Sequence, residues 1–328
     1  MEETKKKIVV IGGGTGLPVI LKELKKQDCE LTAIVTVADD GGSSGKLRKM
    51  MEMAPPGDLR NVLVALSNVE KEWTDIFQYR FENGLENHAL GNLIIAALND
   101  MEGGIYQAVQ TLSRLLNITG KVYPAADESL TLHAVFEDQT ILSGETTITK
   151  RRQTIHEIHV TKDQKDELPE PCPHVVEEIM NADMIVMGPG SLFTSILPNL
   201  MIPEIGKAII ETSAQKVYIC NIMTQKGETE EFSDADHVKI LHRHLHHRFI
   251  DTVLVNVETI PLEKMNAQRY DEYLVQVRHD PCALKEEHCQ VVAKNFLCLR
   301  DEGVFHDGEK VVQALMEQLE KGEKKKEG

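Results

Sequence analysis

Two glycine-rich segments carry the residue types and spacing in this chain that best suit ligand chemistry. The first, Gly12–Gly16, directly follows the apolar run Ile8–Ile11 and precedes a helical pattern of leucines and isoleucine. Glycines at the end of a buried strand permit a tight turn and let a ligand approach the backbone closely. Free amide groups at the start of the next helix attract an anion. This order predicts a strand, a phosphate-type loop and a helix.

The spacing of this first loop fits neither of two common nucleotide motifs. Counted from Gly12 and Gly14, a dinucleotide fingerprint needs its third glycine at position 17, which is Leu17. The Gly-Lys-Ser/Thr ending of a P-loop is missing as well. An NAD-dependent oxidoreductase therefore fits the loop only loosely. A plain strand–helix turn remains an alternative interpretation.

The second segment, Gly188–Ser191, repeats this arrangement after the apolar run Met184–Met187. Ser191 is expected to cap a helix, and the neighbouring amides could bind phosphate. Ligands of open parallel sheets bind beyond the carboxyl ends of the strands, where the strand order reverses. Two glycine loops on one sheet edge should therefore converge on one crevice.

Acidic residues follow the second predicted strand, Leu31–Val37. Asp39 and Asp40 stand where an acid in nucleotide folds bonds a ribose hydroxyl, or where it could hold Mg²⁺ beside phosphates. Alternatively, both carboxylates cap the next helix. Asp58 is similarly open to two interpretations, either the N-cap of a helix over Leu59–Leu66 or a metal ligand.

Two polar residues, Arg60 and Asn61, come one turn into that predicted helix and could face an anionic ligand or pair with nearby acids. A cluster of histidines lies further along, at His242, His244, His246 and His247. The first and third are spaced i,i+4, but no carboxylate stands at the spacing of a known zinc helix motif. We expect a basic, partly exposed helix face there.

The order of elements predicts how these residues are positioned. Strands alternating with helices indicate an α/β fold with a Rossmann-like, doubly wound, mainly parallel sheet. We expect one domain over residues 1–320, and short alternating segments at about 120–160 predict a β-rich insert. A last helix is predicted over Lys310–Glu320, followed by a charged, disordered tail, Lys321–Gly328.

Composition limits the class of protein. The chain has 328 residues, and 36 basic against 52 acidic side chains give a net charge of −16. This disfavours a nucleic-acid partner, which usually meets a basic face. No stretch resembles a membrane span or a signal sequence. Six scattered cysteines without a C-x-x-C pair predict free thiols in a cytoplasmic protein.

Five motifs together resemble one known family. Their order and spacing are similar to the YvcK-like gluconeogenesis factors of the CofD-like (2-phospho-L-lactate transferase) superfamily, over roughly residues 7 to 260. The motifs are Ile11–Gly16, Thr36–Gly45, Pro56–Asn61, His88–Asn92 and Met187–Asn199.

This resemblance implies a Rossmann-like fold and a cytoplasmic bacterial homo-oligomer with a protein partner that the sequence does not identify. The YvcK-like branch is implied to bind a UDP-sugar, UDP-N-acetylglucosamine, and to serve gluconeogenic growth, cell shape and cell-wall synthesis. The transferase branch joins a phospholactyl group to a deazaflavin with a guanosine nucleotide donor and Mg²⁺. Both a UDP-sugar sensor and an Mg²⁺-dependent transferase therefore stay open, and no catalytic residue is assigned.

The resemblance also implies site residues. Metal-binding acids of the transferases fall at Asp40 and Asp58, while the second loop departs from the transferase pattern Gly-Pro-Ser-Asn-Pro. Contacts to a nucleotide sugar are expected at Gly12, Gly13, Gly14, Thr15, Gly16, Asp39, Asn92, Gly188, Gly190, Ser191, Thr194, Ser195 and Tyr270, the last within a Gln-Arg-Tyr segment.

Overall fold

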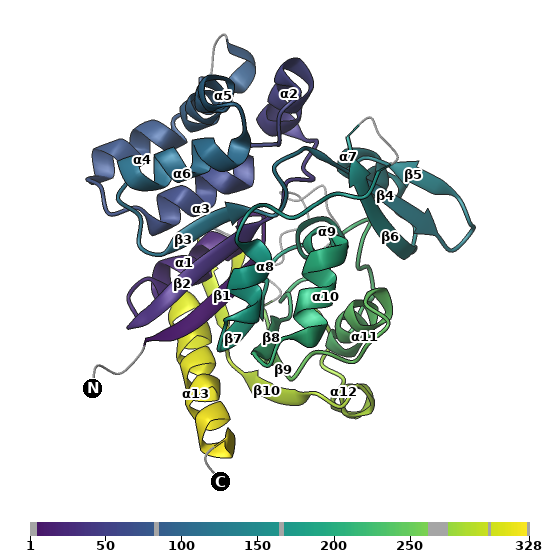
Figure 1. Cartoon of the computed structure of the whole chain (residues 1–328). Coiled ribbons are helices and arrows are strands. Elements are labelled where there is room, and N and C mark those ends of the chain that lie inside the picture. The colour runs from purple at the N-terminus through teal and green to yellow at the C-terminus, as the bar shows by residue number, and fades with distance from the viewer. Residues whose placement is uncertain (1–4, 82–84, 164–166, 262–274, 301–302, 327–328) are drawn as a thin grey trace.

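A computed structural model describes residues 5–81, 85–163, 167–261, 275–300 and 303–326 (Figure 1). Its centre is a seven-stranded sheet with the strand order β10-β9-β8-β7-β1-β2-β3, in which every neighbouring pair is parallel. The predicted doubly wound α/β fold is confirmed. The strands are β1 (Lys6–Gly12), β2 (Cys29–Val35), β3 (Lys121–Pro124), β7 (Met184–Met187), β8 (Gln215–Ile219), β9 (Thr252–Asn256) and β10 (Gln290–Lys294).

The central strand β1 is apolar because both of its faces are covered. Its residues Ile8–Ile11 are at most 1% exposed, and the same holds for Met184–Met187 of the neighbouring β7. The chain adds β2 and β3 on one side of β1, and then β7 to β10 on the other. The strand order therefore reverses between β1 and β7, which is where both glycine loops begin.

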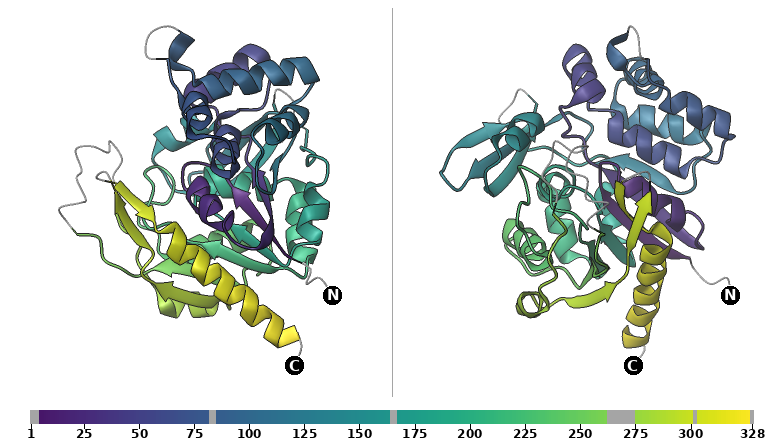
Figure 2. Two further views of the ribbon diagram at one scale, coloured as in Figure 1. Left: turned by 90° about the vertical axis from the view of Figure 1, so that its left-hand side faces the viewer. Right: turned by 180° about the vertical axis from the view of Figure 1, so that it is seen from behind.

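Helices cover both faces of the sheet (Figures 1 and 2). On one face α1 (Leu17–Leu24) packs against α13 (Gly308–Lys326), and on the other α8 (Val175–Met180) packs against α10 (Pro203–Glu211). The apolar side of α1 is fully buried, as the helical pattern after the first loop predicts. The other helices of the second half are α9 (Leu197–Leu200), α11 (Asp234–His244) and α12 (Pro281–Glu286).

A helical group stands between β2 and β3 in the chain and lies at the top of Figure 1. The helix predicted over Leu59–Leu66 is present as part of α3, but Asp58 lies inside its first turn and Pro56 occupies the N-cap, so the N-cap interpretation of Asp58 is wrong. The group comprises α2 (Gly42–Met51), α3 (Gly57–Leu66), α4 (Lys71–Gln78), the 3-10 turn η1 (Leu85–Asn87), α5 (Leu90–Glu102) and α6 (Ile105–Leu115).

The β-rich insert exists but starts later than predicted. Residues 121–124 pair in parallel with β2 and so form the edge of the main sheet. The insert itself is an antiparallel sheet in the order β5-β4-β6 with one short helix. Its elements are β4 (Leu130–Phe136), β5 (Ile141–Ser143), α7 (Glu145–Arg151) and β6 (Ile155–Lys162).

The C-terminal part contains a hairpin, β11 (Leu297–Arg300) and β12 (Gly303–His306), before α13. Helix α13 continues to Lys326. The prediction that the helix ends at Glu320 is therefore wrong, and so is the prediction of a disordered tail for residues 321–326. Lysine and glutamate are good helix formers, so a run rich in both can continue a helix although it is highly charged. All six cysteines are free thiols, as predicted. Within the described residues, no helix is both long and apolar enough to cross a bilayer.

The predicted basic histidine face is also wrong in part. His242 and His244 are 6% and 7% exposed, and burial lowers the pKa of both rings, so they are not cationic surface groups. His242 bonds the Glu287 carboxylate through Nδ1 at 2.8 Å. Nε2 of His244 accepts the backbone N–H of Ile158 at 3.1 Å. These histidines hold α11 to α12 and to the insert.

Candidate functional site

The two glycine loops touch each other at the carboxyl edge of the sheet. The backbone N–H of Gly188 donates to the carbonyl oxygen of Ile11 at 3.0 Å. A Cβ placed on Gly190 would lie 3.1 Å from the carbonyl oxygen of Gly13, and one on Gly16 would lie 3.1 Å from that of Pro189. The loops are so close that a side chain at Gly16 or Gly190 would push them apart. The predicted convergence of the two loops is therefore confirmed.

The middle of the first loop requires glycine for two separate reasons. Gly14 has φ +69°, a backbone conformation that side-chain-bearing residues rarely adopt. Gly13 is crowded, because an added Cβ would lie 2.5 Å from both Asp58 Oδ2 and Thr36 Cγ2. Thr15 between the loop glycines and α1 is exposed. Glycine at these two positions therefore permits the turn and the close approach of a carboxylate.

That carboxylate is Asp58, whose Oδ2 accepts the backbone N–H of Gly14 at 2.7 Å. Burial raises the pKa of Asp58 to about 6, although the bond from Gly14 opposes this shift. Asp39 lies near enough that its charge adds to the effect. Burial also raises the pKa of Asp39, while the N–H of Gly41, 2.8 Å from its Oδ1, lowers it. Asp58 therefore contacts the first loop directly, and Asp39 lies near Asp58.

The second loop is fixed by side chains that sequence reasoning did not single out. Ser191 Oγ accepts the N–H of Thr194 at 3.1 Å, which confirms the predicted cap, here on a π-helical turn, η2 (Leu192–Ile196). The Ser191 hydroxyl donates in turn to Glu228. Asn221, after β8, exchanges two hydrogen bonds with the backbone of Gly190, at 2.9 and 3.2 Å.

Thr194 and Ser195 complete this loop from η2. Both side chains are buried, and the Ser195 hydroxyl oxygen would be 3.6 Å from a Cβ on Gly14. The side chain of Thr194 is hydrogen-bonded to the carboxyl group of Glu145, which comes from the insert. Of the predicted residues, the structure thus brings together the two glycine loops, Asp39, Asp58, Thr194 and Ser195, and only Tyr270 lies outside the described residues.

Glu145 is the least expected member of the site. Burial, together with the charges of Asp39, Glu228 and Asp58, raises its pKa to about 9. At neutral pH this carboxyl is therefore protonated and can donate a hydrogen bond. In the sequence, only the glycine before it, Gly144, could have drawn attention to Glu145. In the structure Gly144 has φ +91°, and a Cβ there would lie 2.5 Å from Asp40 Oδ2, so a side chain has no room.

Asp40 turns toward the insert. Its Oδ1 accepts both the backbone N–H and the hydroxyl of Thr146, at 2.9 and 2.6 Å, and so fastens the start of α7 to the core. Among the described residues, no three His, Cys, Asp or Glu side chains are arranged to hold a metal ion. A Mg²⁺ ion held by Asp40 and Asp58 would take phosphate oxygens or water as its remaining ligands.

Asn92 belongs to a neighbouring layer of polar contacts. Its Nδ2 donates to Ser43 Oγ at 3.0 Å, and Ser43 Oγ is 2.8 Å from His88 Nδ1. These bonds join the first turn of α5 to the first turn of α2. Ser44 in that turn of α2 is hydrogen-bonded to the carboxylate of Asp39. Asn92 thus supports the acid-bearing loop through α2.

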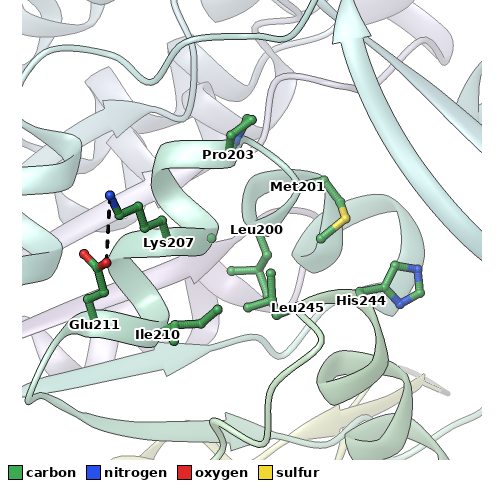
Figure 3. Close-up of a pocket in the computed structure, with 9 residues that line it drawn as sticks. Leu200, Met201, Pro203, Lys207, Ile210, Glu211, His244 and Leu245 are labelled. Atoms are coloured by element: carbon green, nitrogen blue, oxygen red, sulfur yellow. Dashed lines mark ion pairs between the residues drawn. The ribbon is translucent and has the colours of Figure 1, made fainter.

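A surface groove of about 460 Å³ is lined by none of the residues of the glycine loops (Figure 3). Its walls come from α9, α10 and the end of α11, with Leu200, Ile210 and Leu245 toward its floor and His244 at one side. The ion pair Lys207–Glu211, 3.9 Å apart, lies at its other side. The groove shares no residue with the predicted site.

Fold and site together define a Rossmann-like α/β protein whose candidate crevice lies where the strand order reverses, between two contacting glycine loops. The family model for 2-phospho-L-lactate transferase CofD matches residues 8–297. The chain therefore belongs to the CofD family.

Relatives share nearly the whole chain. A protein of Streptococcus pneumoniae serotype 4 is 56% identical over 316 residues, which cover 95% of this chain and 97% of the relative. The gluconeogenesis factor of Listeria monocytogenes is 48% identical over 320 residues, 97% of each chain. The crystal structure of protein BH3568 from Bacillus halodurans matches with a TM-score of 0.91 and 44% identity, covering 95% of this chain and all of that one.

Proposed function

We propose that this protein binds a UDP-sugar, UDP-N-acetylglucosamine, and acts as a cytoplasmic regulator needed for gluconeogenic growth, cell shape and cell-wall synthesis. The observation that carries the proposal is the contact between the two glycine loops at the strand-order reversal. Backbone amides there suit a diphosphate, which needs many donors and close approach. The name of the Listeria relative, a gluconeogenesis factor, supports the physiological part. A homo-oligomer and a protein partner belong to the same proposal.

The acids around the loops suit the sugar and ribose end of such a ligand. Asp39 can accept from a hydroxyl, as acids at this position do in nucleotide folds. Glu145, protonated at neutral pH, can donate to a hydroxyl or a phosphate oxygen. Because a protonated Glu145 adds no negative charge, it does not repel a diphosphate. The ligand then needs no metal ion to offset the charge of this group.

Calorimetry with UDP-N-acetylglucosamine, GDP and NAD, each with and without Mg²⁺, tests the proposal. We expect tight, metal-independent binding of the UDP-sugar and no turnover of it. The variant Gly14→Val should abolish this binding with the fold retained, because a β-branched residue opposes φ +69° and fills the loop. Normal binding by Gly14→Val would remove the first loop from the site.

The second candidate is an Mg²⁺-dependent transferase, favoured by the family match and by Asp58 beside the glycine loop. Asp40 and Asp58 would then share the ion with phosphate oxygens, which stabilise charge on a transferred group. Turnover that disappears in Asp40→Asn or Asp58→Asn would support this candidate and overturn the sensor.

A further inference from the structure

A buried arginine with open hydrogen-bond donors lies next to the site. Arg60, in the first turn of α3, is 4% exposed. Its Nη2 donates to Asn61 Oδ1 at 2.9 Å, but its Nε and Nη1 are buried without a hydrogen-bond partner in the described structure. Leaving charged donors buried and unpaired costs folding free energy. A ligand acceptor would remove that cost.

A second arginine, Arg80, forms an antiparallel β-bridge with Ala89, two residues before the Gly91 that packs on Arg60. The pKa of Arg60 is lowered to about 10. Burial is the largest cause of this shift, and the charge of Arg80 is the second. Arg80 is exposed, and its Nη1 makes a long contact of 3.5 Å with the carbonyl oxygen of Asn87. No acid forms an ion pair with either arginine in the described part of the chain, although acids outnumber bases 52 to 36 overall.

The surroundings hold Arg60 in place. A Cβ on Gly91 would lie 2.8 Å from Arg60 Cδ and 2.6 Å from the carbonyl oxygen of Phe77, so glycine at this position lets α5 pack directly on the arginine stem. Gln78 Nε2 reaches the same Asn61 Oδ1 at 3.4 Å. The Arg60 side chain is therefore held in advance between α3, α4 and α5.

We propose that Arg60 and Arg80 form an oxyanion subsite for a phosphoryl or carboxylate group of a small molecule. The planar fork of Arg60 matches the oxygens of either group, and one anion between two like charges removes their repulsion. Asp58, whose charge also acts on Arg60, joins this subsite to the glycine loops. The oxyanion is either part of the UDP-sugar or belongs to a separate ligand.

Inorganic phosphate is the probe, compared with chloride at equal ionic strength in thermal unfolding. The full-length chain and Arg114→Gln, which removes an exposed arginine of α6, should show a Tm that rises with the logarithm of phosphate concentration. Arg60→Met and Arg80→Gln should lose most of this rise. Equal responses of all four proteins would overturn the subsite.

Unfolding in urea without phosphate separates binding from a structural role. Arg60→Met keeps the apolar stem and removes the unpaired donors, so its midpoint should equal or exceed that of the parent chain. A lower midpoint together with an unchanged phosphate response would overturn the proposal. If Arg60→Met does not fold, Arg60→Lys serves instead, because it keeps the charge, loses the fork and should weaken the phosphate response.

Calorimetry then identifies the source of the oxyanion. If the anion belongs to the UDP-sugar, Arg60→Met should bind UDP-N-acetylglucosamine roughly tenfold or more weakly, as expected for a lost charged hydrogen bond. If the anion belongs to a separate ligand, the affinity of Arg60→Met for UDP-N-acetylglucosamine stays unchanged. Phosphate then still raises the Tm of the parent chain when the UDP-sugar is bound. If the protein responds to phosphate but does not bind the UDP-sugar, the oxyanion subsite is supported and the proposed function is refuted.

Discussion

The carboxylate of Asp58 accepts a hydrogen bond from the backbone N–H of Gly14, with Oδ2 2.7 Å from the nitrogen, and so ties α3 to the first glycine loop. This bond engages one of the amides that an anionic ligand would use. Because burial raises the pKa of Asp58 to about 6, the charge on this carboxyl changes near physiological pH. Stability, pH dependence and ligand binding should therefore be linked through this residue.

Asp58→Asn should make the unliganded protein more stable at pH 8. The folded-state pKa of about 6 lies above the ordinary value of 3.8, so the folded state holds the proton more tightly and wild-type stability falls as pH rises between them. A shift of that size corresponds to about 3 kcal/mol, which the asparagine avoids while keeping an acceptor for Gly14. Urea unfolding at pH 4 and pH 8 measures this.

The control for that comparison is Asp28→Asn, at a side chain 84% exposed and paired with Lys5. It should change stability by no more than about 0.5 kcal/mol at either pH, as surface substitutions do. An Asp58→Asn variant less stable than wild type at pH 8 would show that the charged carboxylate is needed for folding.

Gly13→Ala should destabilise the first loop by about 1–3 kcal/mol, the usual cost of overpacking. Its Cβ would lie 2.5 Å from Asp58 Oδ2 and from Thr36 Cγ2, so the loop or α3 must shift. Gly12→Ala is the matched control, since its nearest neighbour would be Leu17 Cδ1 at 3.6 Å, an ordinary contact. Thermal unfolding of both variants measures the difference, and equal losses would contradict the close packing of Gly13.

Without metal, affinity for UDP-N-acetylglucosamine should fall as pH rises from about 5 to 7. In that range Asp58 loses its proton and its negative charge opposes the diphosphate. Mg²⁺ requires the charged carboxylates, so a metal-dependent complex should show the opposite trend. Calorimetry at several pH values, with Mg²⁺ or EDTA, distinguishes these, and Asp58→Asn should flatten the metal-free profile.

Asp40→Ala should loosen the insert. It removes the acceptor for both the N–H and the hydroxyl of Thr146, a loss of about 1–3 kcal/mol for the start of α7. Hydrogen exchange should quicken in residues 145–151 but not in β1. Asp100→Ala, at an exposed position of α5, is the control. Unchanged exchange in α7 would mean that other contacts hold the insert.

Local sequence patterns were enough to predict the main sheet, both loops and one helix cap. The apolar runs Ile8–Ile11 and Met184–Met187 have no polar face, so they had to be buried on both sides. Ser191 caps the residues directly after it, and such a contact spans only three positions. Element boundaries were less certain, because residues 121–124 joined the main sheet through a partner strand far away in the chain.

The sequence by itself therefore determined the strands, the glycine loops and their common edge, since these follow from periodicity and from the special backbone of glycine. Only the tertiary structure decided which side chains from distant segments face those loops. Glu145 arrives from the insert, Glu228 and Asn221 arrive from beyond β8, and His244 turns inward. Contacts across such separations, and the pKa shifts that burial causes, depend on packing that no local pattern records.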